Sequence, residues 1–126
     1  MFPYDVAVWE RFLDNYGKLY EGFYYDIMCG KPAKRFPHWE TKYTRDAEIL
    51  SRLRIDAVGV RADGLDIIEV KPRANMASIG QVLTYKQCFF EDYNPPKSLR
   101  ALIVAAEIDQ NIIPLLEKEG IVYIQI

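Results

Sequence analysis

The sequence has 126 residues, half of them hydrophobic and 27% of them charged. This is enough chain to bury the core of one domain but not of two, and the apolar content excludes a disordered chain, so we expect residues 1–126 to form a single domain. The 16 basic and 18 acidic residues leave a net charge of −2, which argues against indiscriminate binding to nucleic acid.

The first two elements are predicted to be a helix and a strand. Over residues 6–19, apolar side chains recur every three or four positions, which predicts an amphipathic helix with Asp5 as its N-cap and Gly17 at its end. Residues 22–29 are rich in aromatic and β-branched side chains and predict a strand.

A basic stretch follows this strand. Residues 30–45 contain glycine and prolines and predict a long loop, with one helical turn over about 45–50. Residues 31–54 carry seven basic and three acidic side chains, with aromatic residues between them. Such a stretch can attract a phosphate backbone even though the whole chain is slightly acidic, but a solvated basic loop explains the same charge pattern.

The middle of the chain predicts a β-hairpin. Residues 53–60 and 65–71 have the composition of strands, and Asp63-Gly64 between them is a strong turn signal. Pro72 cannot donate a hydrogen bond to a sheet, so we expect the second strand to end there.

The remaining chain predicts alternating helices and strands. Residues 78–90, with Ser78 as N-cap, predict a helix, and the continuous apolar run over residues 99–106 predicts a buried parallel strand. Residues 109–118 predict a helix and residues 121–126 a last strand. The predicted order is therefore α-β-β-β-α-β-α-β, which belongs to the α/β fold class.

Two further features bear on the cellular context. The longest apolar run, residues 101–106, is far shorter than the ~20 residues of a membrane-spanning helix, and the first residues carry no basic signal region. Cys29 and Cys88 form no CxxC pair, so we expect reduced, buried thiols rather than a zinc or iron–sulfur site. These features predict an intracellular, cytoplasmic protein without a membrane partner.

Three charged side chains in the hairpin suggest a catalytic site. Glu69 and Lys71 are two residues apart in a strand and therefore point to the same face, and pairing of the two arms, with allowance for a bulge, brings Asp56 close to them. Two adjacent carboxylates repel one another unless a cation lies between them, and Mg²⁺ prefers oxygen ligands. Each residue alone has an ordinary structural explanation, but the combination inside apolar runs is more specific.

At these residues the sequence resembles the PD-(D/E)XK nuclease superfamily. Asp56 is followed after twelve residues by Glu69-Val70-Lys71, on two antiparallel strands that come after an N-terminal helix. The resemblance implies a restriction-endonuclease-like core, α-β-β-β-α-β, with an extra C-terminal helix and strand. Gln81 and Tyr85 are one helical turn apart and are similar to the Gln-x-x-x-Tyr motif of the RecB-like branch.

The resemblance implies hydrolysis of DNA phosphodiester bonds with Mg²⁺ or Mn²⁺. Asp56, Glu69 and the backbone carbonyl of Val70 would hold the metal, which would polarise a phosphate oxygen and activate a water molecule. Lys71 would orient this water and offset the charge that develops in the transition state. In the Gln-x-x-x-Tyr motif, the amide would hold the water or the lysine, and the phenol would contact a phosphate or a base.

Contacts to DNA are expected from the basic stretch and from the end of the hairpin. The residues expected to contact the backbone are Lys34, Arg35, Lys42 and Arg73, and those expected to stack on unpaired bases are Trp39 and Tyr43.

The sequence departs from the RecB-like pattern in its metal-binding residues. It lacks the iron–sulfur cysteines of many members, and its only histidine, His38, lies in the basic stretch, where a metal ligand, a surface residue and a phosphate contact are all compatible with its position. Glu10 lies where many superfamily members have an acidic residue that faces the site. A metal ligand and an ordinary solvent-facing residue are both compatible with its position.

Three functions are compatible with the sequence, and a metal-dependent deoxyribonuclease is favoured. The first alternative, a non-cleaving nucleic-acid-binding or assembly protein on the same fold, would need none of the three hairpin charges. The second, a hydrolase of another phosphate-containing substrate on an unrelated α/β fold, lacks support because the chain has no glycine-rich phosphate loop. Because so short a chain lacks room for its own specificity domain, we also expect a homodimer or a partner protein, as for a compact viral or mobile-element nuclease.

Overall fold

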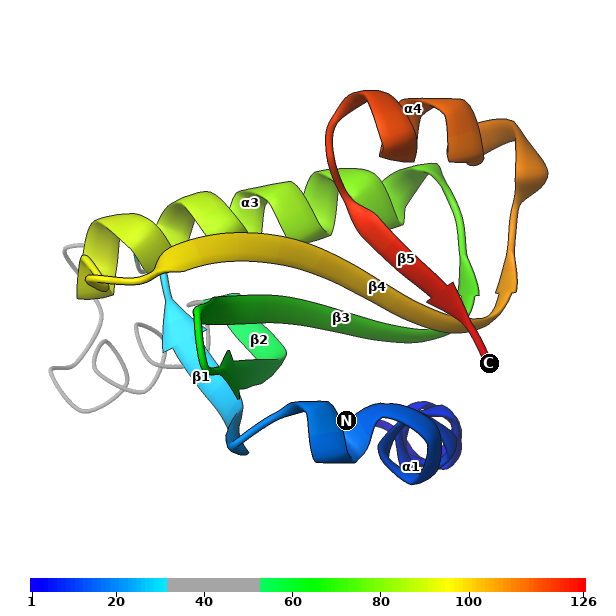
Figure 1. Cartoon of the computed structure of the whole chain (residues 1–126). Helices are drawn as coiled ribbons and strands as arrows, with labels where there is room; N and C mark the ends of the chain where they lie inside the picture. Colours follow the sequence, from blue (N-terminus) through cyan, green and yellow to red (C-terminus); the bar gives the residue numbers. More distant parts are fainter. Residues whose placement is uncertain (32–52) are drawn as a thin grey trace, which may run out of the picture.

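The computed structural model describes residues 1–31 and 53–126 as a mixed α/β domain (Figure 1). The helical segments are α1 (Pro3–Tyr16), η1 (Gly17–Leu19), α3 (Met76–Tyr93), η2 (Gln110–Ile112) and α4 (Ile113–Lys118). The strands are β1 (Gly22–Cys29), β2 (Leu53–Arg61), β3 (Gly64–Ala74), β4 (Ser98–Ile108) and β5 (Val122–Gln125). The predicted helical turn and most of the predicted loop lie outside the described residues. In the described part, no helix is long and apolar enough to cross a bilayer.

The strands form one sheet in the order β1-β2-β3-β4-β5. Strand β2 is antiparallel to both β1 and β3, whereas β4 runs parallel to β3 and β5 runs parallel to β4. Helix α3 makes the crossover between β3 and β4, which confirms the predicted α/β order.

Helices cover both faces of the sheet. Figure 1 shows α1 on one face and α3 with α4 on the other. The apolar stripe of α1, which includes Trp9 and Phe12, packs with Ile68 and Leu102 in one core cluster. On the opposite face, Val82 of α3 packs in a second cluster that includes residues of β4 and α4. Alternate residues of β3 and β4 therefore serve opposite cores.

Two predicted N-caps are wrong. Helix α1 begins at Pro3, because proline at the first helical position needs no N–H partner, and Asp5 is buried within the first turn. Helix α3 begins two residues before the predicted Ser78. Its N-cap is Asn75, whose side chain accepts a backbone N–H two residues later, while the Ser78 hydroxyl accepts the Asn75 N–H.

Pro72 does not end its strand, contrary to the prediction. Strand β3 continues to Ala74 and pairs with β4 on both sides of the proline, at Lys71 and Arg73. The described pairing of β3 with β2 stops at Ile68. The Val70 N–H points toward β2, and backbone groups two residues apart in a strand point to the same side, so the nitrogen of Pro72 also faces β2. Because the described β2–β3 pairing has already ended there, the missing N–H of proline costs no hydrogen bond of that ladder.

A buried carboxylate that sequence reasoning missed joins three strands. Asp66 is completely buried in β3. Its oxygens accept hydrogen bonds from Arg61 Nε at 2.9 Å, from Arg100 Nε at 2.9 Å, from Arg100 Nη2 at 2.8 Å and from the Tyr20 hydroxyl. The Asp66 network, defined by these four side chains, thus ties β3 to β2, to β4 and to the segment after η1.

Candidate active site

The site forms where β2 separates from β3. The described pairing between these strands ends at Ala57 and Ile68. At the next residue of β2, the Asp56 side chain replaces the backbone as hydrogen-bond acceptor, and its Oδ2 accepts the Val70 N–H at 2.9 Å. The N–H and C=O of a strand residue point to the same side, so the Val70 carbonyl is also directed toward β2. The local break in the ladder therefore brings a carboxylate and a backbone carbonyl together.

Glu69 and Lys71 lie on the α3 face of β3, as alternation predicts. Glu69 Oε1 is 3.2 Å from Lys71 Nζ. The residue is only 2% exposed, and its second oxygen, Oε2, is buried with no hydrogen-bond partner among the described residues. Leaving a buried carboxylate oxygen unpartnered is costly, which indicates a group that meets a further cation or donor.

Burial and neighbouring charges raise the pKa values of the carboxyl groups of the site. Burial, followed by the charge of Asp56, raises the pKa of Glu69 to about 7, although Lys71 opposes the shift. Burial also raises the pKa of Asp56, against the hydrogen bond from Val70. The pKa of Tyr85 rises to about 12, first by burial and then through the charges of Glu69 and Asp56, which places its phenol within electrostatic range of both.

Helix α3 supplies the remaining predicted site residues. Tyr85 packs in the cluster that holds Ile67 and Phe89, and Gln81 lies one turn earlier on the same side of the helix. The structure thus brings Asp56, Glu69, Lys71 and Tyr85 together, with Gln81 next to them along the helix.

The acidic residue of α1 that electrostatically couples to the site is Asp5, which sequence reasoning had taken as a cap. After burial, its charge contributes to the rise in the pKa of both Asp56 and Glu69. Glu10 is exposed and lines a hollow of about 370 Å³ that Asp56 also lines, so it borders the site without being buried in it. Pro3 was the sequence signal that would have placed Asp5 inside the helix.

The residues predicted to contact DNA are mostly not described. Arg73 is exposed on β3, two residues beyond Lys71 and on the same face. The other predicted contacts lie outside the described residues, and these are Lys34, Arg35, Lys42, Trp39 and Tyr43, together with His38.

The pKa of Glu69 predicts a pH dependence of stability in the absence of metal. The unfolded chain loses this proton near the ordinary value of 4.5, whereas the folded protein keeps it up to about pH 7. The unfolded state therefore binds fewer protons in this window, and the free energy of unfolding should fall as pH rises from about 4.5 to about 7 and then level off. Urea unfolding in EDTA at pH 5 and pH 8 measures the difference.

Glu69→Gln removes the titrating carboxyl and should remove most of this dependence of the free energy of unfolding on pH. At pH 8 the variant should be more stable than the parent, by an amount on the order of 3 kcal/mol, since one pKa unit corresponds to about 1.4 kcal/mol. Glu119→Gln, at an exposed position after α4, serves as the matched control and should leave the slope unchanged. Equal slopes in the parent and in Glu69→Gln would contradict the assigned pKa.

The described part of the chain holds no ready-made cage of three His, Cys, Asp or Glu side chains. It does hold the smaller ligand set that Mg²⁺ accepts when water completes its octahedron, namely two carboxylates and one backbone carbonyl. The unpartnered Oε2 of Glu69 fits such an ion, because a cation would compensate the buried charge.

The fold of this α/β domain is similar to that of solved endonucleases. No protein-family model and no curated protein matches the chain. Among solved structures, a repair endonuclease from Pyrococcus abyssi has a TM-score of 0.59 and 22% sequence identity, over 97% of this chain and 46% of that one. An EndoMS–dsDNA complex has a TM-score of 0.58 and 22% identity, over 97% of this chain and 44% of that one.

EndoMS in its apo form is also similar, with a TM-score of 0.56 and 17% identity over 97% of this chain and 45% of that chain. The chain therefore spans less than half the length of the structures that it resembles. The likeness confirms the predicted fold class and excludes the unrelated α/β fold that the third functional hypothesis required.

Proposed function

We propose that this chain is the catalytic domain of a metal-dependent nuclease that hydrolyses DNA phosphodiester bonds. The observation that carries the proposal is the buried Glu69 carboxylate, which lies beside Lys71 and Asp56 and keeps one oxygen unpartnered among the described residues. A fold has no structural need for such an arrangement, whereas a metal site has.

Mg²⁺ or Mn²⁺ fits these residues best. Asp56, Glu69 and the Val70 carbonyl would hold the ion, and water would fill its other positions. When bound, the metal supplies Lewis acidity toward a phosphate oxygen and lowers the pKa of a bound water. The chain itself must keep Glu69 ionised, and Lys71 does so in part, because its ammonium lowers the pKa that burial raises.

Lys71 has a second role in the proposed reaction. Its ammonium is half-buried and fixed by Glu69, so it can orient a water against the phosphorus and stabilise the negative charge that builds up there. Gln81 and Tyr85, on the facing side of α3, would position the water or a phosphate oxygen. This pair also supports assignment to the RecB-like branch of the PD-(D/E)XK superfamily.

The choice of DNA as substrate rests on two supports. One neighbour of this fold is named a repair endonuclease and another was solved with double-stranded DNA. The chain itself carries Arg73 beside the site and the basic stretch of residues 31–54. We also propose that a second copy or a partner protein contributes to the DNA-binding surface.

A non-cleaving DNA-binding protein on the same fold is the alternative. It would not need a buried carboxylate with a pKa near 7, nor a lysine paired to it. No observation in the described residues favours it over the nuclease.

Circular DNA tests the proposed function directly. Circles have no ends, so we expect supercoiled plasmid or single-stranded circles to be cut in Mg²⁺ or Mn²⁺ and to stay intact in EDTA, as an endonuclease requires. Cleavage of linear DNA alone would indicate an exonuclease. DNA that is bound but not cut with either metal would support the non-cleaving alternative.

A further inference from the structure

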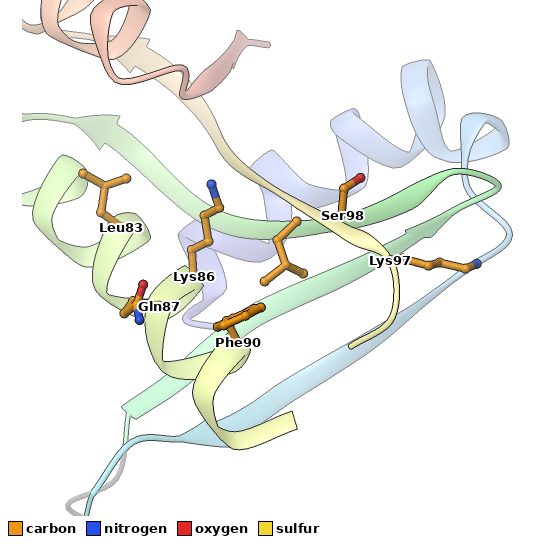
Figure 2. Close-up of a pocket in the computed structure, with 7 residues that line it drawn as sticks. Leu83, Lys86, Gln87, Phe90, Lys97 and Ser98 are labelled. Atoms are coloured by element: carbon orange, nitrogen blue, oxygen red, sulfur yellow. The ribbon is translucent and has the colours of Figure 1, made fainter. Parts of the chain in front are cut away.

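A groove lies between α3 and the first residues of β4, away from the candidate active site (Figure 2). Its volume is about 510 Å³. The residues that line its walls are Leu83, Lys86, Gln87 and Phe90 of α3 and Ser98 and Leu99 of β4. We refer to it below as the α3–β4 groove.

The α3–β4 groove and the active site use different sides of the same helix. Residues of an α-helix advance by about 100° each, so Leu83 and Gln87 lie on roughly the opposite side of α3 from Gln81 and Tyr85. Whatever binds in the groove is therefore not held by the catalytic residues, and the inference does not rest on the proposed nuclease activity.

One wall of the groove is an incomplete sheet edge. Strand β5 pairs with β4 only from Leu102 to Ala105, whereas β4 itself begins at Ser98. The Ala105 carbonyl accepts the Ile126 N–H on this outer side, so alternation directs the backbone groups of Leu99 to the same side. No described strand pairs with β4 there, which leaves space for a short strand in line with β5.

The groove offers apolar contacts next to this edge. Phe90 is 49% exposed, and Leu83 and Leu99 are only partly buried. The Phe90 ring lines the same groove as Ser98 and Leu99 of β4. An extended segment on the edge could cover these side chains, and its apolar residues would gain by doing so.

The charge of the groove selects an acidic occupant. The Lys86 ammonium rises toward β4 in Figure 2, is half-buried, and has no hydrogen-bond or ion-pair partner among the described residues. Lys97 lies at the far end, 3.5 Å from the Arg61 carbonyl. Among the described residues no carboxylate lines the groove, so the Lys86 charge is uncompensated there.

We propose that the α3–β4 groove binds an extended acidic segment of a partner protein, which adds to the free edge of β4 as a short strand. Backbone hydrogen bonds to Leu99 would give the segment its direction, apolar side chains would cover Phe90, and a carboxylate would pair with Lys86. A nucleic acid strand has no backbone N–H to match this edge, so the observations favour a peptide.

A display library of random octapeptides, selected for binding to the intact chain, tests the proposal. Selected peptides should combine Asp or Glu with apolar residues, and a synthesised winner should slow hydrogen exchange of the Leu99 amide. N-methylation of alternate peptide amides should abolish binding, because it removes the donors that face β4. A pool without acidic enrichment, or protection elsewhere on the sheet, would overturn the proposal.

Charge reversal at Lys86 completes the test. Lys86→Glu should weaken the winning peptide by at least about tenfold, and Lys86→Gln by less, while Lys118→Glu on α4 should leave the affinity unchanged. Thermal unfolding verifies that each variant folds. Equal loss for Lys118→Glu would mean non-specific charge attraction. Two other outcomes would also overturn the proposal. One is a second copy of the chain in the groove, seen as concentration-dependent dimers that Lys86→Glu disrupts. The other is an oligothymidylate that competes with the peptide.

Discussion

Replacing Lys71 with alanine should reduce DNA cleavage by about 10²-fold or more, the usual scale for a lost transition-state contact. The binding of Mn²⁺ and of DNA should persist, because Lys71 supplies neither a metal ligand nor a large share of the basic surface. Single-turnover cleavage, with Mn²⁺ calorimetry and DNA titration alongside, measures the three quantities separately. Lys118→Ala on α4 is the matched control and should cleave normally.

The pH profile of the Lys71 variant separates two ways in which this lysine can act. Its charge lowers the pKa of Glu69, so its removal should shift the rise of activity with pH to higher values. If that were its whole role, Lys71→Ala would regain full activity well above pH 7. We expect a residual loss at the high-pH plateau, because the ammonium also contacts the reacting water or phosphate.

The ligand variants should behave differently from the lysine variant. Asp56→Asn and Glu69→Gln each remove an anionic oxygen from the proposed metal site, so both should lose Mn²⁺ binding together with cleavage. Normal Mn²⁺ affinity in both variants would contradict the assigned ligands. Unchanged cleavage in Lys71→Ala would reject its catalytic role while leaving the ligands untouched.

The sequence predicted the centre of the hairpin well, because the signals there are local. The two arms pair around a turn at Ala62 and Asp63, one residue before the predicted Asp63-Gly64 step, and strand alternation then places Glu69 and Lys71 on one face. The prediction allowed for a bulge beside Asp56, whereas the described pairing of β2 with β3 ends at Ala57 and Ile68. The hydrogen bond from the Val70 N–H to the Asp56 carboxylate depends on where β2 leaves β3, and a short stretch of sequence does not contain that information.

Features that depend on contacts between distant segments were missed. Asp5 looked like an N-cap because it precedes an apolar repeat, but packing of α1 on the sheet buries it near Asp56. Pro72 looked like a strand end, yet β3 continues through it, because the missing N–H of proline lies on the side of β3 where no β2 residue is described as its partner. Such outcomes are decided by which face or edge meets which neighbour, and a single sequence does not contain that information.

The Asp66 network should be a major contribution to stability. Asp66→Ala would leave Arg61 and Arg100 without their buried acceptor and the Tyr20 hydroxyl without its partner. Removing one member of a buried ion pair typically costs 3–5 kcal/mol, so we expect a loss of about that size in the free energy of unfolding. Urea denaturation at constant pH measures it, followed by both fluorescence and circular dichroism.

Asp63 provides a control on the same arginine. Its carboxylate lies 2.6 Å from Arg61 Nη1, closer than Asp66 lies to Arg61, but its side chain is 82% exposed. An exposed ion pair contributes only about 0–1 kcal/mol, because water screens the charges and already solvates them. Asp63→Ala should therefore change stability little although it breaks the shorter contact. Equal losses in the two variants would mean that distance rather than burial governs these pairs, and a loss below about 1 kcal/mol for Asp66→Ala would contradict its role in holding β2, β3 and β4 together.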